Sequence, residues 1–256
     1  MKIILIGSGN LATHLGIALN AKHTILQVYS RSEASSKLLA RKLSCRYTTD
    51  VKNISTEADC YIVALRDEAI RSFLQKFPST NKIVAHTSGS VPLKIFGDRF
   101  KNSGVFYPVQ TFSIKHPVDL KKVPVCIEAA NDSTKKKLTS LAKSITASIH
   151  YMNSEQRKRI HLAAVFANNF SNHLFAIAEN ILAREKISFD LLRPLIFETA
   201  MKVQRYSPLE VQTGPAKRGD IAVMEEHLKL LSGKKEFTDI YKRISESISG
   251  MSGIRL

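Results

Sequence analysis

A glycine-rich turn near the amino terminus has the residue types and spacing that hold a phosphate. The run Gly7-Ser8-Gly9-Asn10-Leu11-Ala12 has the form GxGxxA. In this form the first glycine permits a tight turn, the second lets a pyrophosphate approach the backbone, and the small alanine lets a helix pack closely on a sheet. The run follows the apolar segment 2–6 and precedes a predicted helix over 10–20, whose free N–H groups and dipole favour an anion. We therefore predict a dinucleotide site. Its expected contacts are Gly7, Ser8, Gly9, Asn10 and Leu11.

The residues after the second predicted strand, 24–29, favour a phosphate on the adenosine ribose. NAD enzymes usually place Asp or Glu at this strand end to hold the ribose 2′-hydroxyl, whereas this chain has Ser30-Arg31-Ser32. Arg31 can hold a 2′-phosphate by charge-assisted hydrogen bonds, and Ser30 and Ser32 can add hydroxyl donors. Glu33 lies near the usual acidic position, but we assign it to the first turn of the next helix. The predicted cofactor is NADP(H) in preference to NAD(H).

Three later strands, predicted over 59–65, 82–86 and 104–107, end in further candidate residues. Open α/β sheets bind their ligands at the carboxyl ends of the strands. The candidates are Leu65, His86 and Ser88 for the cofactor, and Gln110 and Thr111 for the substrate. For His86 and Ser88 the alternative is a purely local role, as a strand cap and a turn around Gly89.

A polar stripe is predicted on a largely apolar helix in the second half of the chain. His161, Asn168 and Asn172 are spaced i, i+7, i+11, which at about 100° per residue places them within a sector of roughly 40°. Polar groups on a buried helix need partners, either a ligand or a structural network. We interpret His161 as a candidate proton donor, since imidazole titrates near neutral pH. Asn168 and Asn172 are candidate contacts to nicotinamide or substrate, and Asn169 to substrate.

A charged loop over 213–220 is the last candidate. It contains Gly214, Pro215, Lys217, Arg218 and Asp220. Arg218 is suited to bind the carboxylate of an anionic substrate. The alternative is an Arg218–Asp220 pair that fixes the loop while Asp220 caps the next helix.

The elements that must position these residues change in kind at residue 152. Short β-rich runs alternate with helical segments over 1–152, which predicts a Rossmann-type, doubly wound parallel sheet. From 153 to 256 the strands stop, and we expect an all-helical domain. Asn153 and Gln156 form a predicted capping box for a helix that meets no Gly or Pro before Ile187. Further helices are expected over 189–205, 220–231 and 237–249.

The composition argues against several kinds of partner. Lys and Arg number 38 against 22 Asp and Glu, a net charge of +16. The basic residues are scattered and not interleaved with aromatic residues in one stripe, so we do not expect nucleic acid as the ligand. Attraction for an anionic cofactor and substrate accounts for the charge. No apolar window reaches the ~18 residues of a membrane helix, so a cytoplasmic protein without a membrane partner is expected.

The three cysteines give no sign of a metal or disulfide framework. Cys45, Cys60 and Cys126 are odd in number and irregularly spaced, which favours buried free thiols. The chain has no CxxC pair and no HExxH motif, so no metal site is predicted.

Several longer motifs resemble one family. They are His86-Thr87-Ser88-Gly89-Ser90, Tyr107-Pro108-Val109-Gln110-Thr111-Phe112, the segment 161–170 and the segment 213–220, together with the glycine-rich run. Over nearly its whole length the chain resembles Rossmann-like NADP oxidoreductases related to pyrroline-5-carboxylate reductase and deazaflavin-dependent NADP reductase. The resemblance implies a helical dimerisation domain, a nicotinamide cleft between the domains, and a homodimer.

Two departures from related families leave the chemistry open. The 3-hydroxyacid dehydrogenases carry a catalytic Lys four residues before an Asn, and here Val165 precedes Asn169. Prephenate dehydrogenases have His before Pro after the sixth strand, and here Tyr107 precedes Pro108. The leading expectation is hydride transfer between NADP(H) and a small anionic carbonyl or imine substrate. The alternatives are a non-catalytic NADP-binding sensor and a deazaflavin-linked NADP reductase.

Overall fold

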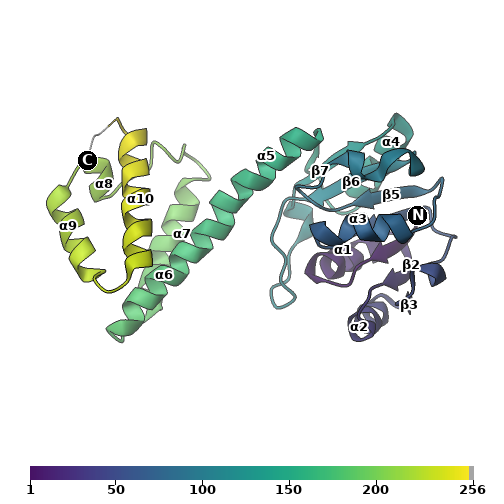
Figure 1. The fold of residues 1–256 in the computed structure, drawn as a ribbon, viewed down its shortest axis with the longest axis horizontal. Coiled ribbons are helices and arrows are strands. Elements are labelled where there is room, and N and C mark those ends of the chain that lie inside the picture. Colours follow the sequence, from purple (N-terminus) through teal and green to yellow (C-terminus); the bar gives the residue numbers. More distant parts are fainter. Residues whose placement is uncertain (254–256) are drawn as a thin grey trace. The chain divides into compact units, whose positions relative to one another are not determined.

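The computed structural model describes residues 1–253, and their strands form one eight-stranded sheet in the order β3-β2-β1-β4-β5-β6-β7-β8 (Figure 1). The strands are β1 (Lys2–Ile6), β2 (Thr24–Tyr29), β3 (Arg46–Thr48), β4 (Cys60–Val63), β5 (Ile83–His86), β6 (Ser103–Pro108), β7 (Val125–Ala129) and β8 (Ile149–Tyr151). The predicted α/β class with a Rossmann-type sheet is confirmed. β1 lies at the topological switch point of the sheet, where the strand order reverses, with β2 on one side and β4 on the other. A doubly wound sheet forms its ligand crevice at this point.

One strand pair departs from the parallel arrangement that the sequence predicted. β7 runs antiparallel to β6, with Tyr107 opposite Cys126, while β7 and β8 are parallel. Only a loop and the short 3₁₀ helix Leu120–Lys122 join β6 to β7. A parallel return usually uses a crossover helix that packs on the sheet, and the structure has no α-helix between these two strands.

The sheet is buried on both faces because its central strands are almost continuously apolar. Along β1, Ile3 and Leu5 join one core cluster while Ile4 and Ile6 join the other, as the alternation of side chains in a strand requires. The helices α1 (Asn10–Asn20), α2 (Glu33–Leu43) and α4 (Asp132–Lys143) contribute to the first cluster, and α3 (Asp67–Lys76) contributes to the second. These two layers hold the carboxyl ends of the strands in place.

The first turns of α2 and α3 are capped differently. Ser32 caps α2 by accepting from the Ser35 N–H, and Glu33 lies in the first turn as expected. At α3, Asp67 is the first helical residue and not the N-cap, and Arg66 precedes it without a side-chain cap. The Asp67 carboxylate accepts from the hydroxyl of Ser90, in the loop after β5.

A long helix follows Asn153, as predicted, but it contains a wider turn. Asn153 and Gln156 form the reciprocal capping box, with both hydrogen bonds at 2.9 Å. The helix runs through α5 (Ser154–Ala164), a π-helical segment Val165–Phe170 and α6 (Ser171–Arg184). A π-helix turns through a smaller angle per residue than an α-helix, so the alignment calculated for His161, Asn168 and Asn172 does not hold across it. Such segments often mark functional sites.

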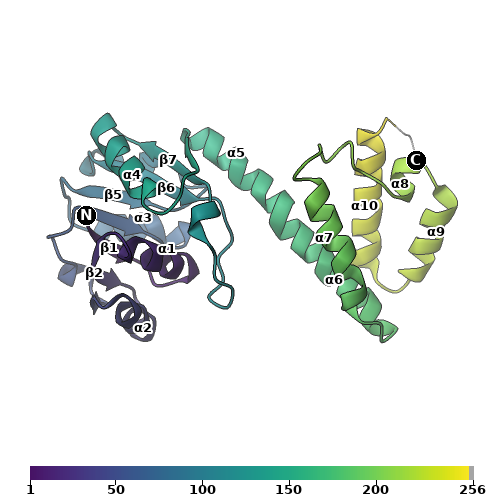
Figure 2. The same cartoon turned by 180° about the vertical axis from the view of Figure 1, so that it is seen from behind.

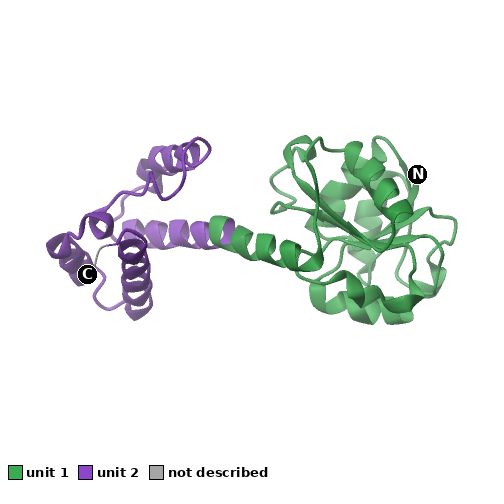
Figure 3. Ribbon diagram, turned by 90° about the horizontal axis from the view of Figure 1, so that it is seen from above, with its two compact units in different colours: residues 1–167 green, residues 168–256 purple. Residues whose placement is uncertain are grey.

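The contacts divide the chain into two compact units, residues 1–167 and residues 168–256 (Figure 3). The division falls inside the π-helical segment, so α5 belongs with the sheet. The boundary placed at 152 on the sequence marks a different feature, the end of the last strand.

The second unit is helical among its described residues, 168–253 (Figure 2). After α6 come the 3₁₀ helix Phe189–Leu192, α7 (Arg193–Lys202), α8 (Pro215–Arg218), α9 (Ile221–Leu230) and α10 (Lys235–Met251). Its buried residues in that range are Ala216, Ser245 and Ser249, and many large apolar side chains are exposed. Across residues 1–253, no helix combines the length and the hydropathy that a membrane span would need.

Candidate functional site

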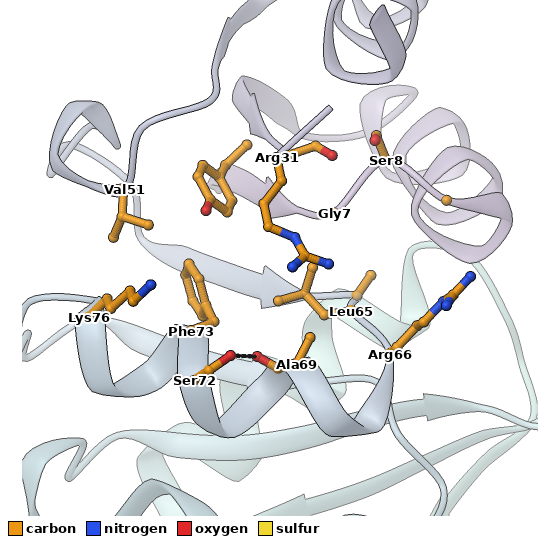
Figure 4. A pocket seen from close by; sticks show the side chains of 14 residues that line it. Gly7, Ser8, Arg31, Val51, Leu65, Arg66, Ala69, Ser72, Phe73 and Lys76 are labelled. Atoms are coloured by element: carbon orange, nitrogen blue, oxygen red, sulfur yellow. Dashed lines mark hydrogen bonds between the residues drawn. The ribbon is translucent and has the colours of Figure 1, made fainter. Parts of the chain in front are cut away.

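A cavity of about 280 Å³ lies at the carboxyl ends of β1, β2 and β4, in the first unit (Figure 4). Its walls come from the glycine-rich turn, the end of β2, the end of β4 and one face of α3. The lining residues are Gly7, Ser8, Gly9, Tyr29, Ser30, Arg31, Val51, Ala64, Leu65, Arg66, Ala69, Ser72, Phe73 and Lys76. Six of the predicted cofactor contacts are therefore brought together, namely Gly7, Ser8, Gly9, Ser30, Arg31 and Leu65.

The backbone requires a glycine at position 7, whereas the glycine at position 9 leaves open space. Gly7 has a φ of +124°, and a Cβ there would lie 2.2 Å from the Ala64 carbonyl oxygen. At Gly9 a Cβ would meet nothing within 4 Å, so the space above it is open to a ligand. Gly9 is also the N-cap residue of α1, where no side chain caps the helix. An open helix N-terminus over a glycine is the arrangement that receives a pyrophosphate.

Three cations surround the cavity. Arg31 points into it from the end of β2, while Arg66 and Lys76 lie at its two sides (Figure 4). Among the ion pairs of residues 1–253, none involves any of these three side chains. Unpaired cations converging on a cavity attract an anion. The residues therefore fit the anionic groups of NADP at two places: the pyrophosphate at the turn and the 2′-phosphate near Arg31.

Arg66 and Lys76 were missed on the sequence, although a signal for Lys76 is present. Ala69, Ser72, Phe73 and Lys76 have the spacing i, i+3, i+4, i+7 on α3, which places them on one helix face. That face lines the cavity. Recognising it needs the knowledge that α3 lies beside the end of β2, which a single sequence does not supply.

Three other predicted cofactor contacts lie outside the cavity lining. The Ser32 hydroxyl caps α2, and Leu11 packs against the core. The Asn10 side chain donates to the Phe112 carbonyl at 2.8 Å. A role for these residues toward the cofactor stays a prediction.

The loop after β5 is held by its own side chains. Ser88 Oγ accepts the backbone N–H groups of Ser90 and Val91 at 3.1 and 3.0 Å, and Ser90 donates to Asp67. His86 is fully buried and stacks on Phe96 with 5.5 Å between ring centroids. These contacts match the local alternative that the sequence left open for His86 and Ser88.

His86 is neutral at physiological pH. Burial, reinforced by the nearby Arg157 charge, lowers the pKa of His86 to about 3. Its Nδ1 accepts the Ser88 N–H at 3.2 Å, and its Nε2 has no hydrogen-bond partner among the described residues. A neutral imidazole of such low basicity is unsuited to deliver a proton.

A buried arginine ties α5 to this loop. Arg157 is fully buried and forms an ion pair with Glu128 of β7. It also donates to the Ser88 carbonyl at 3.2 Å and to the Val91 carbonyl. Ser154 donates its hydroxyl to the same Glu128 carboxylate. The run Arg157-Lys158-Arg159 does not reveal from the sequence alone which of its members faces the sheet.

His161, one turn further along α5, contacts a tyrosine. Tyr107 Oη lies 3.3 Å from His161 Nδ1, and the two rings meet edge to face at 73°. Burial raises the pKa of Tyr107, so its hydroxyl keeps its proton at neutral pH. A Cβ on Gly89 would lie 2.8 Å from both His161 Nδ1 and Tyr107 Cζ. The pair therefore sits directly over Gly89, at the carboxyl ends of β5 and β6.

The remaining substrate candidates are exposed. The Gln110 side chain accepts the Thr111 N–H at 2.8 Å in an exposed turn. In the second unit, Asn168 and Asn169 lie in the π-helical segment, Asn172 lies on α6, and all three are exposed. Arg218 lies 3.8 Å from Asp220, which caps α9, as the structural alternative describes. Whether these residues meet a substrate stays a prediction.

The geometry of the cavity agrees with the similarity of the chain to known proteins. A family model described as NADP oxidoreductase, coenzyme F420-dependent, matches residues 2–88, and one described as a domain of unknown function matches residues 123–248. The structure of a putative NADP oxidoreductase from Bacteroides fragilis is 40% identical, covers 97% of this chain and 98% of its own, and has a TM-score of 0.90. The chain belongs to this family of NADP oxidoreductases. The resemblance inferred from the sequence is confirmed.

Two more distant structures share the fold. A 1-pyrroline-5-carboxylate reductase from Streptococcus pyogenes is 14% identical over 98% of both chains, with a TM-score of 0.65. A reductive aminase from Aspergillus terreus, in complex with NADPH and ethyl levulinate, is 14% identical over 98% of this chain and 97% of its own, with a TM-score of 0.73. Among curated proteins, none matches the sequence at a significant level.

Proposed function

We propose that this NADP oxidoreductase reduces the C=O or C=N bond of a small anionic compound with NADPH. The observation that carries the proposal is the cavity of unpaired cations at the glycine-rich turn. Gly7 and Gly9 permit a pyrophosphate to approach the open N-terminus of α1, and Arg31 offers a planar guanidinium to the 2′-phosphate. Lys76 adds a second positive charge on the far side of the cavity.

For this reaction the protein must orient the cofactor and the substrate and deliver a proton to the substrate. NADPH supplies a hydride from the nicotinamide C4. The substrate heteroatom must then receive a proton from a nearby acid. Three titratable groups at the carboxyl edge of the sheet are unsuited to this role. His86 is neutral, Asp67 accepts a hydrogen bond from Ser90, and Glu128 forms an ion pair with Arg157. His161 is the imidazole left to act as proton donor, and Asn168, Asn169, Asn172, Gln110, Thr111 and Arg218 are the candidate substrate contacts.

The helical unit supports a homodimer. Ala216 is the one apolar residue buried among residues 168–253, and a unit of this size needs an apolar core to fold. α7 exposes Leu195 and Phe197, at 62% and 67%. Because a helix that is apolar on several sides is normally buried, a second copy of this chain is the partner that we assign to these surfaces.

One observation favours a second candidate, transfer of hydride between NADP and a reduced deazaflavin. The family model that matches residues 2–88 is described as dependent on coenzyme F420, a deazaflavin. In that reaction a deazaflavin would replace the small anionic substrate as the partner in hydride transfer.

The two candidates are separated by a substrate panel. Purified protein is incubated with NADPH and either cyclic imino acids, keto acids with an amine, or an oxidised deazaflavin, and the reduced product is identified by mass. A reduced imine or carbonyl product supports the proposal, and a reduced deazaflavin supports the second candidate. If NADPH binds but no member of the panel is reduced, catalysis of this kind is rejected in favour of a binding role.

A further inference from the structure

The contact between Tyr107 and His161 joins two elements that are far apart in sequence. Tyr107 is near the end of β6 and His161 is on α5, yet Tyr107 Oη and His161 Nδ1 are 3.3 Å apart. Both side chains are half-buried, so each keeps some access to solvent or ligand. A neutral hydroxyl can either donate or accept a hydrogen bond. It can therefore pair with Nδ1 whether the imidazole is neutral or protonated, which a backbone carbonyl cannot do.

The position of His161 is fixed by its neighbours on the same helix face. Arg157 precedes it by four residues, so the two side chains project on the same side of α5. Arg157 binds β7 through Glu128 and the loop after β5 through the Ser88 and Val91 carbonyls. Gly89, inside that loop, leaves just enough room for both rings. The imidazole is therefore held between a rigid helix anchor and the end of the sheet.

We infer that Tyr107 is the positioning residue for His161, holding its Nδ1 so that the proton delivered to the substrate leaves from Nε2. The inference rests on the proposed function. With hydride added at the substrate carbon, the π electron pair moves to the oxygen or nitrogen, which takes the Nε2 proton of the imidazolium. The imidazole that remains keeps its proton on Nδ1, where it donates to Tyr107 Oη, and solvent returns a proton to Nε2.

The groups around the pair allow this assignment. Asp67 of α3, Cys126 of β7 and Arg157 of α5 are the titratable or charged groups that act on Tyr107. Asp67 and Arg157 have partners of their own. Cys126 is a buried thiol whose pKa is raised to about 11 by burial, so it stays neutral. Tyr107 is thus the group positioned to form a hydrogen bond with His161.

The test compares Tyr107→Phe with Tyr151→Phe, a tyrosine on the exposed edge strand β8. The phenylalanine ring keeps the packing on Gly89 and removes the hydroxyl alone. Turnover is measured with a substrate from the panel, and the imidazole of His161 is followed in the ligand-free protein by ¹⁵N NMR, assigned with His161→Asn. We expect Tyr107→Phe to bind NADPH like the wild type, to lower kcat on the order of 10- to 100-fold, and to change the tautomer signature of His161. Tyr151→Phe should change none of these.

The outcomes separate the inference from the proposed function. An unchanged His161 spectrum in Tyr107→Phe overturns the inference, even if kcat falls, because the hydroxyl is then only structural. An unchanged kcat overturns it as well. If wild-type protein reduces no imine or carbonyl compound, the proposed function fails, while a changed His161 spectrum would still establish the pair. If His161→Asn retains full turnover, the proton donor is another group and both assignments fall.

Discussion

At the scale of the residue, burial decides which groups can take part in proton transfer. His86 and His161 both lie at the carboxyl edge of the sheet, but His86 is enclosed and stacked on Phe96 while His161 is half-buried. The sequence singled out both histidines. It did not distinguish them, because the stacking of Phe96 on His86 and the approach of the distant Arg157 depend on how the chain packs.

The low pKa of His86 makes stability depend on pH. An unfolded histidine binds a proton below its ordinary pKa of about 6.5, whereas folded His86 does so only near pH 3. The unfolded state therefore binds more protons between these values, and folding stability is lost as pH falls through this window, by up to about 1.4 kcal/mol per unit. Urea denaturation of wild type and His86→Phe should show this loss reduced in the variant.

An exposed histidine provides the control for that experiment. His150→Phe, on the edge strand β8, should retain the wild-type slope between pH 6.5 and 3. Equal slopes for wild type and His86→Phe would mean that His86 is not buried as described.

At the scale of the element, the anchoring of α5 explains how a helix is placed against the sheet. Its start could be predicted, since the capping box of Asn153 and Gln156 is local chemistry. So could the glycine-rich turn, because Gly7 and Gly9 act through the backbone. The Arg157–Glu128 pair and the approach of Tyr107 to His161 could not, because each joins segments that are far apart in the sequence. The π-helical segment Val165–Phe170 was not predicted either.

Removing one partner of the buried pair should be costly. Arg157→Met leaves the Glu128 carboxylate, 15% exposed, without its counter-charge, and we expect a loss of about 3–5 kcal/mol in the free energy of unfolding. The exposed neighbour Arg159 gives the control, since Arg159→Met should change stability little. Chemical denaturation measures both.

A double variant separates the effect of lost packing from the effect of an unpaired buried charge. Arg157→Met combined with Glu128→Gln should recover part of the stability lost in the single variant, because no buried charge then remains unpaired. A single variant as stable as wild type would show that the pair does not anchor α5.

At the scale of the whole molecule, the exposed apolar side chains of the helical unit support the proposed homodimer. We expect the protein to have twice the mass of one chain in light scattering, and its unfolding midpoint to rise with protein concentration. Phe197→Glu places a charge on exposed α7 and should shift the protein toward monomer. Leu38→Glu, at a comparably exposed site on α2, should not. A monomer in the wild type would contradict the homodimer.

The most direct test of the account is a calorimetric titration with NADPH and with NADH at physiological salt. The unpaired cations of the cavity predict that NADPH binds at least about tenfold more tightly, since a charge-assisted hydrogen bond is worth about 1.5–3 kcal/mol. Arg31→Ala should remove most of that difference, and Arg41→Ala, at an exposed position of α2, should preserve it. Equal affinity for the two nucleotides, or binding of neither, would contradict the account.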